Sequence, residues 1–175
     1  MSKHMRAAVL LALLCGPALC RAAEMDDKDV KAVIESFRTS IIQHDKPRFL
    51  NLFVSPDIPW QGVLTDDGLA QLRHLNPKAA KVAYDSKSTA TAFIESIQRS
   101  PKSSEQKFSN IKVDTDGDVA TATADYEFLS GEKLVNSGKE CWLLVRTGAG
   151  WKITTLAFSS TLNREEPKKP LVEKH

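Results

Sequence analysis

From residue 107 to residue 160 the side chains alternate between apolar and polar types, and turn residues interrupt the alternation three times. A period of two is typical of β-strands, because successive side chains point to opposite faces of a sheet. The interruptions, at 114–118, 129–133 and 147–150, are short and contain glycine, so consecutive strands are expected to pair antiparallel. The C-terminal third of the chain therefore predicts a four-stranded meander, which excludes an all-helical fold and a purely parallel sheet.

The last hairpin, residues 140–160, is apolar on both of its faces. A three-residue turn at 148–150 pairs Thr147 with Trp151 and keeps the charge of Arg146 on the face opposite Trp151, so this register is favoured. One face is then expected to pack on the helices; it carries Cys141, Leu143, Val145, Trp151 and Ile153. The other face becomes apolar away from the turn; it carries Trp142, Leu144, Leu156 and Phe158.

An apolar patch on the outer face of a sheet usually marks a contact surface. Trp142, Leu144, Leu156 and Phe158 are therefore predicted to form the interface of a homodimer. The alternative is that the C-terminal tail or an inserted loop of the same chain covers them.

The N-terminal half is mainly helical by its periodicity. Apolar residues between 25 and 44 recur at helical spacing, a short second helix is predicted within 45–53, and a third at 88–100. Residues 60–64 read as a short strand. The segment 65–87 is ambiguous, with a short helix possible in its first half.

The first 22 residues have the layout of a secretory signal peptide. A basic start is followed by an apolar run and then by small residues, with cleavage expected after Ala22 or Ala23. The apolar run is far shorter than the ~20 residues of a membrane-spanning helix. The sequence thus predicts a periplasmic or secreted domain over residues 23–160, followed by a flexible charged tail at 161–175.

Removal of the signal peptide would change the charge balance and the cysteine content. The whole chain has 24 Lys and Arg against 22 Asp and Glu, and three of these cations lie in residues 1–22. The mature chain would carry a net charge of −1, which removes the support for a general role on nucleic acid or anionic membranes. Only Cys141 would remain, so the domain cannot contain an internal disulfide.

Three stretches stand out together: "VKAVIESFRTSIIQHDKPRFLNLF", "GDVATATADYEF" and "WLLVRTGAGWKI". With them the chain resembles, over about residues 26–160, the nuclear transport factor 2-like superfamily, which includes SnoaL-like polyketide cyclases and steroid delta-isomerases. It implies an α+β fold in which three N-terminal helices pack in the concave face of a strongly curved, mainly antiparallel sheet. It also implies an apolar pocket and, in many relatives, dimerisation through the outer face of the sheet.

The resemblance does not assign a reaction, because the superfamily shares a shape and not a catalytic set. The pocket is expected to be lined by Phe37, Phe53, Trp60 and Tyr126, although Trp60 and Tyr126 are each also compatible with a place in the core. Asp57, His74 and Tyr126 are weak candidates for an acid or base. Isomerases of this kind use a carboxylate base with a tyrosine and a protonated carboxylic acid, and those roles do not transfer residue by residue.

No motif predicts a metal or a cofactor. The histidines are isolated, paired cysteine spacings are missing, and phosphate or dinucleotide loops are not found. The sequence favours an exported, non-catalytic pocket protein that binds a small apolar ligand or acts as a dimeric accessory subunit. The alternative is a small isomerase, dehydratase or cyclase that uses acid–base chemistry on a hydrophobic substrate.

Overall fold

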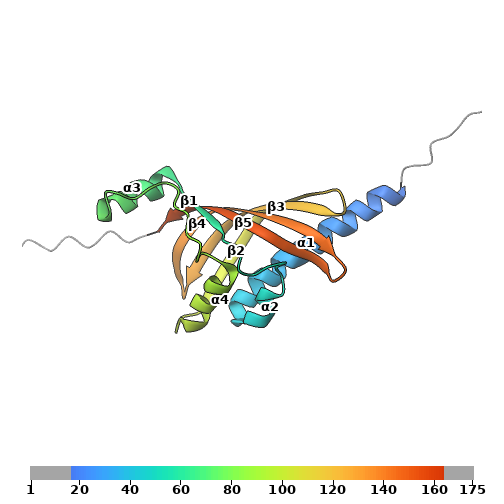
Figure 1. The fold of residues 1–175 in the computed structure, drawn as a ribbon, viewed down its shortest axis with the longest axis horizontal. Helices are drawn as coiled ribbons and strands as arrows, with labels where there is room; N and C mark the ends of the chain where they lie inside the picture. Colours follow the sequence, from blue (N-terminus) through green and yellow to red (C-terminus); the bar gives the residue numbers. More distant parts are fainter. Residues whose placement is uncertain (1–16, 164–175) are drawn as a thin grey trace, which may run out of the picture.

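The computed structural model describes residues 17–163, with side chains from residue 25 onward. One curved sheet of five strands has the order β1-β5-β4-β3-β2, and α1, α2 and α4 cover one of its faces (Figure 1). Strand β1 is parallel to β5, and the other neighbours are antiparallel. This arrangement confirms the predicted α+β architecture. The elements are, in chain order, α1 (Pro17–Gln43), α2 (Lys46–Leu50), β1 (Gln61–Leu64), α3 (Asp66–Leu75), α4 (Ala90–Arg99), β2 (Ser104–Thr115), β3 (Val119–Ser130), β4 (Lys133–Thr147) and β5 (Gly150–Leu162).

Helix α1 packs on the sheet through the stripe that its sequence predicts. Val30, Ile34, Phe37 and Ile41 lie three or four residues apart and are at most 1% exposed. The helix begins at Pro17, several residues earlier than predicted, so it runs through the expected cleavage position. Residues 1–16 of the predicted signal peptide lie outside the described residues. Within residues 17–163, no helix is both long enough and apolar enough to span a bilayer.

Phe37 lies at the centre of an aromatic core between α1 and the sheet. Its ring centroid is 4.8 Å from that of Phe49 and 6.3 Å from that of Trp142, with Trp142 edge-on. Four further rings lie within 6.5 Å of it, those of Phe53, Trp60, Phe93 and Phe108. These rings come from α2, α4, three strand or loop segments and α1 itself. The cluster therefore joins α1, α2 and α4 to the sheet.

The final hairpin differs from the predicted register near its turn. Thr147 pairs with Gly150 and Arg146 with Trp151, so the turn has two residues and not three. Arg146 lies over the Trp151 ring, 5.9 Å from its centroid, and donates to the buried carboxylate of Asp26 at 2.6 Å. A charge beside an aromatic ring is favourable in this geometry, because the ring attracts the cation and α1 supplies the counter-charge. The predicted register, which kept Arg146 on the face opposite Trp151, is therefore wrong near the turn.

A bulge restores the predicted pairing farther from the turn. Leu144 pairs with Ile153 but Leu143 pairs with Thr155, so Thr154 is the extra residue of β5. Beyond it, Trp142 pairs with Leu156 as predicted. Strict alternation assumes that residues pair one to one, so it cannot predict an extra residue in β5.

The prediction of an interface at Trp142, Leu144, Leu156 and Phe158 is wrong, because these residues face the helices. Trp142, Leu144 and Leu156 are at most 2% exposed, and Phe158 packs partly buried against the same core. The outer face of β4 instead carries Cys141, Leu143 and Val145, which were expected inside. Cys141 is a free, exposed thiol.

The ends of the sheet are also longer than the sequence indicates. Strand β2 begins at Ser104, three residues before the predicted alternation starts at residue 107. Strand β5 continues to Leu162, because Thr161 pairs with Ser137 and Leu162 with Asn136. The predicted tail therefore starts two residues too early, and its residues 164–175 lie outside the described residues.

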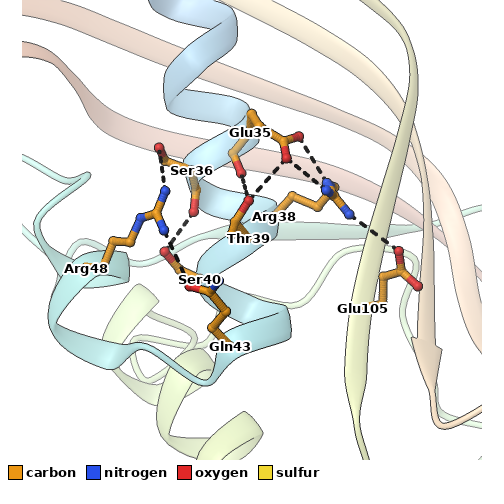
Figure 2. Close-up of polar contacts among 8 residues, drawn as sticks. All are labelled: Glu35, Ser36, Arg38, Thr39, Ser40, Gln43, Arg48 and Glu105. Atoms are coloured by element: carbon orange, nitrogen blue, oxygen red, sulfur yellow. Dashed lines mark hydrogen bonds and ion pairs between the residues drawn. The ribbon is translucent and has the colours of Figure 1, made fainter.

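A polar cluster on α1 fastens the helix to its neighbours (Figure 2). Arg38 binds both carboxylate oxygens of Glu35 at 2.8 and 3.0 Å and reaches Glu105 of β2 at 3.5 Å. This arginine lowers the pKa of Glu35. Arg48 of α2 donates to Ser36 at 3.4 Å. These side chains bind one another at the surface, so the cluster holds α1 against α2 and β2.

Candidate functional site

A cavity of about 350 Å³ opens between the concave face of the sheet and α4, away from the final hairpin turn. The floor comes from β2 to β5, and the opposite wall comes from α4, Trp60 and the loop that precedes α4. Five aromatic residues, six polar residues and one alanine form the lining. The lining residues are Trp60, Asp85, Ser88, Thr89, Ala92, Phe93, Gln106, Tyr126, Phe128, Asn136, Glu140 and Phe158.

Glu140 is the buried carboxyl group of this cavity. It lies on β4 between Ala124 of β3 and Phe158 of β5, on the same face as Trp142, and is 4% exposed. Gln106 Nε2 donates to Glu140 Oε1 at 2.5 Å, and Oε2 has no partner among the described residues. Burial raises the pKa of Glu140 to about 8, and the hydrogen bond from Gln106 opposes only part of this rise. At neutral pH the carboxyl group is therefore largely protonated.

The hydrogen bond from Gln106 also decides which oxygen carries the proton. Because Nε2 donates to Oε1, that oxygen acts as an acceptor and the proton belongs on Oε2. The unpartnered Oε2 is thus a hydrogen-bond donor in the protonated state and a base after ionisation. Gln106 comes from β2 and is itself 3% exposed, which holds this arrangement away from solvent.

Two further polar side chains border the cavity near Glu140. The Tyr126 hydroxyl donates to the Ser159 carbonyl at 3.0 Å, and burial raises its pKa to about 12. Asn136 Oδ1 is buried without a hydrogen-bond partner in the described residues. An unmatched acceptor of this kind costs free energy, which a ligand hydroxyl would recover. Glu140 and Asn136, both in the cavity lining, thus each keep one buried oxygen without a partner among the described residues.

The residues predicted for the site are only partly brought together. Trp60 and Tyr126 line the cavity, whereas Phe37 and Phe53 lie in the aromatic core and not at its wall. Asp57 is exposed and accepts a hydrogen bond from Thr91 at 2.8 Å, outside the cavity lining. His74 is exposed in the last turn of α3, also away from it.

Sequence reasoning missed Glu140, Gln106 and Asn136. The signal for Glu140 was present, because positions 140, 142 and 144 of a strand share a face. Once Trp142 and Leu144 point inward, Glu140 must do so as well. The sequence analysis exchanged the two faces of β4, so it placed Glu140 on the solvent side and did not consider it as a site residue.

No group of three or more histidine, cysteine or acidic side chains within the described residues is placed to hold a metal ion. Among the residues that line the cavity, Glu140, Gln106, Tyr126 and Asn136 can donate or accept hydrogen bonds, and Glu140 can also exchange a proton.

Similarity between this chain and known proteins is found only by comparing structures. No protein-family model matches the sequence, and no curated protein matches it. A provisionally assigned scytalone dehydratase from Novosphingobium aromaticivorans is similar, with TM-score 0.59, 11% identity and coverage of 89% of this chain and 99% of that one. A provisionally assigned dehydratase of the NTF2-like family from Streptomyces avermitilis gives TM-score 0.56 and 17% identity, covering 80% and 99%.

A protein of unknown function with a cystatin-like fold from Nostoc punctiforme is also similar, with TM-score 0.52, 13% identity and coverage of 83% and 94%. The chain has the NTF2-like fold. This confirms the fold implied by the three sequence stretches. The NTF2-like structures include proteins assigned as enzymes and proteins of unknown function, so the fold does not assign a reaction to this one.

Proposed function

We propose that this NTF2-like protein binds a small apolar molecule in the Glu140 cavity and acts on it by general acid–base chemistry. The observation that carries the proposal is a buried carboxyl group with one unpartnered oxygen at the wall of an aromatic cavity. Burying such a group costs stability, and perturbed carboxyl groups in cavities are concentrated at functional sites. This favours the enzyme alternative over the non-catalytic binder that the sequence favoured.

A dehydration illustrates what Glu140 can do alone. The protonated Oε2 gives its proton to a hydroxyl group of the substrate, which leaves as water. The resulting carboxylate then takes a proton from the neighbouring carbon, a carbon–carbon double bond forms, and Glu140 is again protonated. A double-bond isomerisation uses the same two transfers in the reverse order. Asn136 Oδ1 would orient the substrate by accepting from a second hydroxyl, and the names of two structural neighbours are consistent with a dehydratase.

The ability of Glu140 to act as a base can be tested before the substrate is known. In 5-nitrobenzisoxazole, removal of the ring C–H proton breaks the N–O bond and releases a coloured cyanophenolate. We expect the protein to accelerate this reaction, with a rate that rises as Glu140 ionises and has its midpoint near the Glu140 pKa of about 8. Glu140→Gln should reduce the rate more than about tenfold.

Asp57→Asn is the matched control, because it removes an exposed carboxylate outside the cavity. It should leave both the rate and the midpoint unchanged. A Glu140→Gln variant as active as the wild type, or a midpoint near that of an ordinary carboxyl group, would contradict the assignment of Glu140.

We also propose that the chain is exported, which rests on the layout of residues 1–22 alone. Mass spectrometry of protein recovered from the periplasm or medium should give a chain that starts at Ala23 or Glu24. Recovery of the full-length chain from the cytoplasm would count against export.

Homodimerisation through the outer face of the sheet remains a proposal, now with different residues. That face carries Thr121, Thr123, Cys141 and Leu143, which are small, β-branched or apolar, and Leu143 is 38% exposed. Both signs of charge border them, as in the ion pair of Asp125 with Lys139 at 2.6 Å. A surface of this kind is compatible with a two-fold interface, in which the same patch occurs on both copies.

We expect light scattering to report a dimer for the wild type and a monomer for Leu143→Glu, because the glutamate would place like charges together across the two-fold axis. Val54→Glu is the matched control, since Val54 is 55% exposed and lies outside the sheet. That variant should remain dimeric. A monomeric wild type, or a dimeric Leu143→Glu, would remove the support for this interface.

A further inference from the structure

A second cavity, of about 540 Å³, lies beside β1 and next to the first, because Phe158 lines both. It is bounded by β1, by α3 and by the segment that follows α3. That segment runs along the free edge of β1, where Val82 bridges Val63 and the Lys81 carbonyl accepts from the Leu64 amide at 2.9 Å. The lining residues are Gly62, Val63, Leu64, Leu72, Asn76, Lys78, Ala79, Ala80, Lys81, Ala83, Phe158 and Ser160.

Phe158 is the wall that the two cavities share. It pairs in register with Gly62 of β1, and its ring lies against the glycine backbone. A methyl group on Gly62 Cα would come within 3.0 Å of Phe158 Cζ, so a larger residue would press on the ring. With glycine at position 62 the Phe158 ring is not pressed from β1, and Phe158 is only partly buried.

The chemistry of the second cavity differs from that of the first. Its walls are mostly aliphatic, and two lysines are its only charged residues. Lys81 is already bound to Asp66, with Nζ 2.6 Å from Oδ1. The Lys78 ammonium group has no hydrogen-bond or ion-pair partner among residues 17–163. The second cavity thus combines a mostly aliphatic lining with the ammonium group of the exposed Lys78.

We infer that the two cavities are compartments of one binding site for an amphipathic acid. The ring of the ligand lies in the Glu140 cavity, a short aliphatic tail passes Phe158 into the second cavity, and an anionic end group meets Lys78. This deepens the proposed function and rests on it, because the ring compartment is the one in which Glu140 acts. It narrows the substrate class to ring compounds that carry an acidic side chain.

Three probes test the inference by isothermal titration calorimetry: 2-naphthol, 5-(2-naphthyl)pentanol and 5-(2-naphthyl)pentanoate. We expect the alcohol to bind about tenfold more tightly than 2-naphthol, since its methylene groups leave water. The acid should bind about threefold more tightly than the alcohol, through Lys78. In ¹⁵N-correlated spectra, 2-naphthol should shift the amide of Phe93, and the two tailed probes should also shift those of Gly62 and Ala80.

Variants separate the contributions. Lys78→Met should remove the threefold advantage of the acid and leave 2-naphthol unaffected, whereas Lys28→Met, an exposed lysine on α1, should change neither. Ala80→Trp should fill the second cavity and cancel the gain from the tail. If 2-naphthol binds but the tail adds nothing, the second compartment is overturned and the proposed function stands. If no probe binds, both the second compartment and the proposed function are overturned. If the acid still binds more tightly than the alcohol in Lys78→Met, the contact between the anionic end group and Lys78 is overturned.

Discussion

Replacing Glu140 with glutamine should remove most of the pH dependence of stability between pH 5 and pH 8. In the folded protein the pKa of Glu140 is about 8, whereas a glutamate in the unfolded chain has a pKa near 4.3. Between these values the folded state keeps a proton that the unfolded state has released. The free energy of unfolding therefore falls as the pH rises through this window and levels off above about pH 8.

The expected fall is a few kcal/mol in the wild type, since each unit of pKa shift corresponds to about 1.4 kcal/mol. Glutamine keeps the shape of the side chain, accepts from Gln106 and does not ionise. At pH 8.5 the variant should thus be more stable than the wild type, and at pH 5 the two should be close. The carboxyl groups whose pKa is lowered, such as Glu35 and Asp125, lose their stabilising effect only below this window.

Urea unfolding at pH 5, 6, 7, 8 and 9 measures this dependence directly. Glu127→Gln is the control, because Glu127 is exposed on the opposite face of the sheet and its removal should leave the wild-type slope intact. A Glu140→Gln variant that retains the full slope would show that Glu140 ionises normally in the folded protein. The acid–base role proposed for it would then lose its basis.

Helix α1 and strand β3 could be predicted because each has one dominant period. Val30, Ile34, Phe37 and Ile41 mark α1 without ambiguity, and alternation marks β3 with Ala120 to Tyr126 inward. The turn of the last hairpin could not be predicted in the same way. Its register depends on Arg146 reaching Asp26, 120 positions earlier in the chain, and on one extra residue at Thr154.

The site was less predictable than the fold because its groups meet only in three dimensions. Glu140 and Gln106 are 34 positions apart and lie on strands that both flank β3, so their hydrogen bond has no local signature. The raised pKa of Glu140 arises from burial, which depends on the face assigned to β4. An error of one residue in register reverses that face, and here it turned the principal candidate for catalysis into an apparent surface group.

The observed register with a two-residue turn and the predicted register with a three-residue turn place Trp142 and Leu143 on opposite faces of β4. Substitutions at these two positions should therefore differ strongly in their effect on stability. Trp142 is 2% exposed and edge-on to Phe37 and Phe108. Trp142→Ala should therefore lower the free energy of unfolding by about 3–5 kcal/mol, through lost burial and an unfilled cavity. Leu143 is 38% exposed on the outer face, so Leu143→Ala should cost less than about 1 kcal/mol. With a three-residue turn Leu143 would face the helices, and Leu143→Ala would be the more destabilising of the two changes.

Urea unfolding of both variants at one low protein concentration gives the comparison, because a dimer would couple stability to concentration. Trp142→Phe is the conservative control: it keeps a ring against Phe37 and removes an indole N–H that has no partner among the described residues. Most of the lost stability should return in that variant. If Leu143→Ala proves the more damaging change, β4 faces the other way, and Glu140, two residues before Trp142 on the same face, would then lie in solvent and outside the cavity.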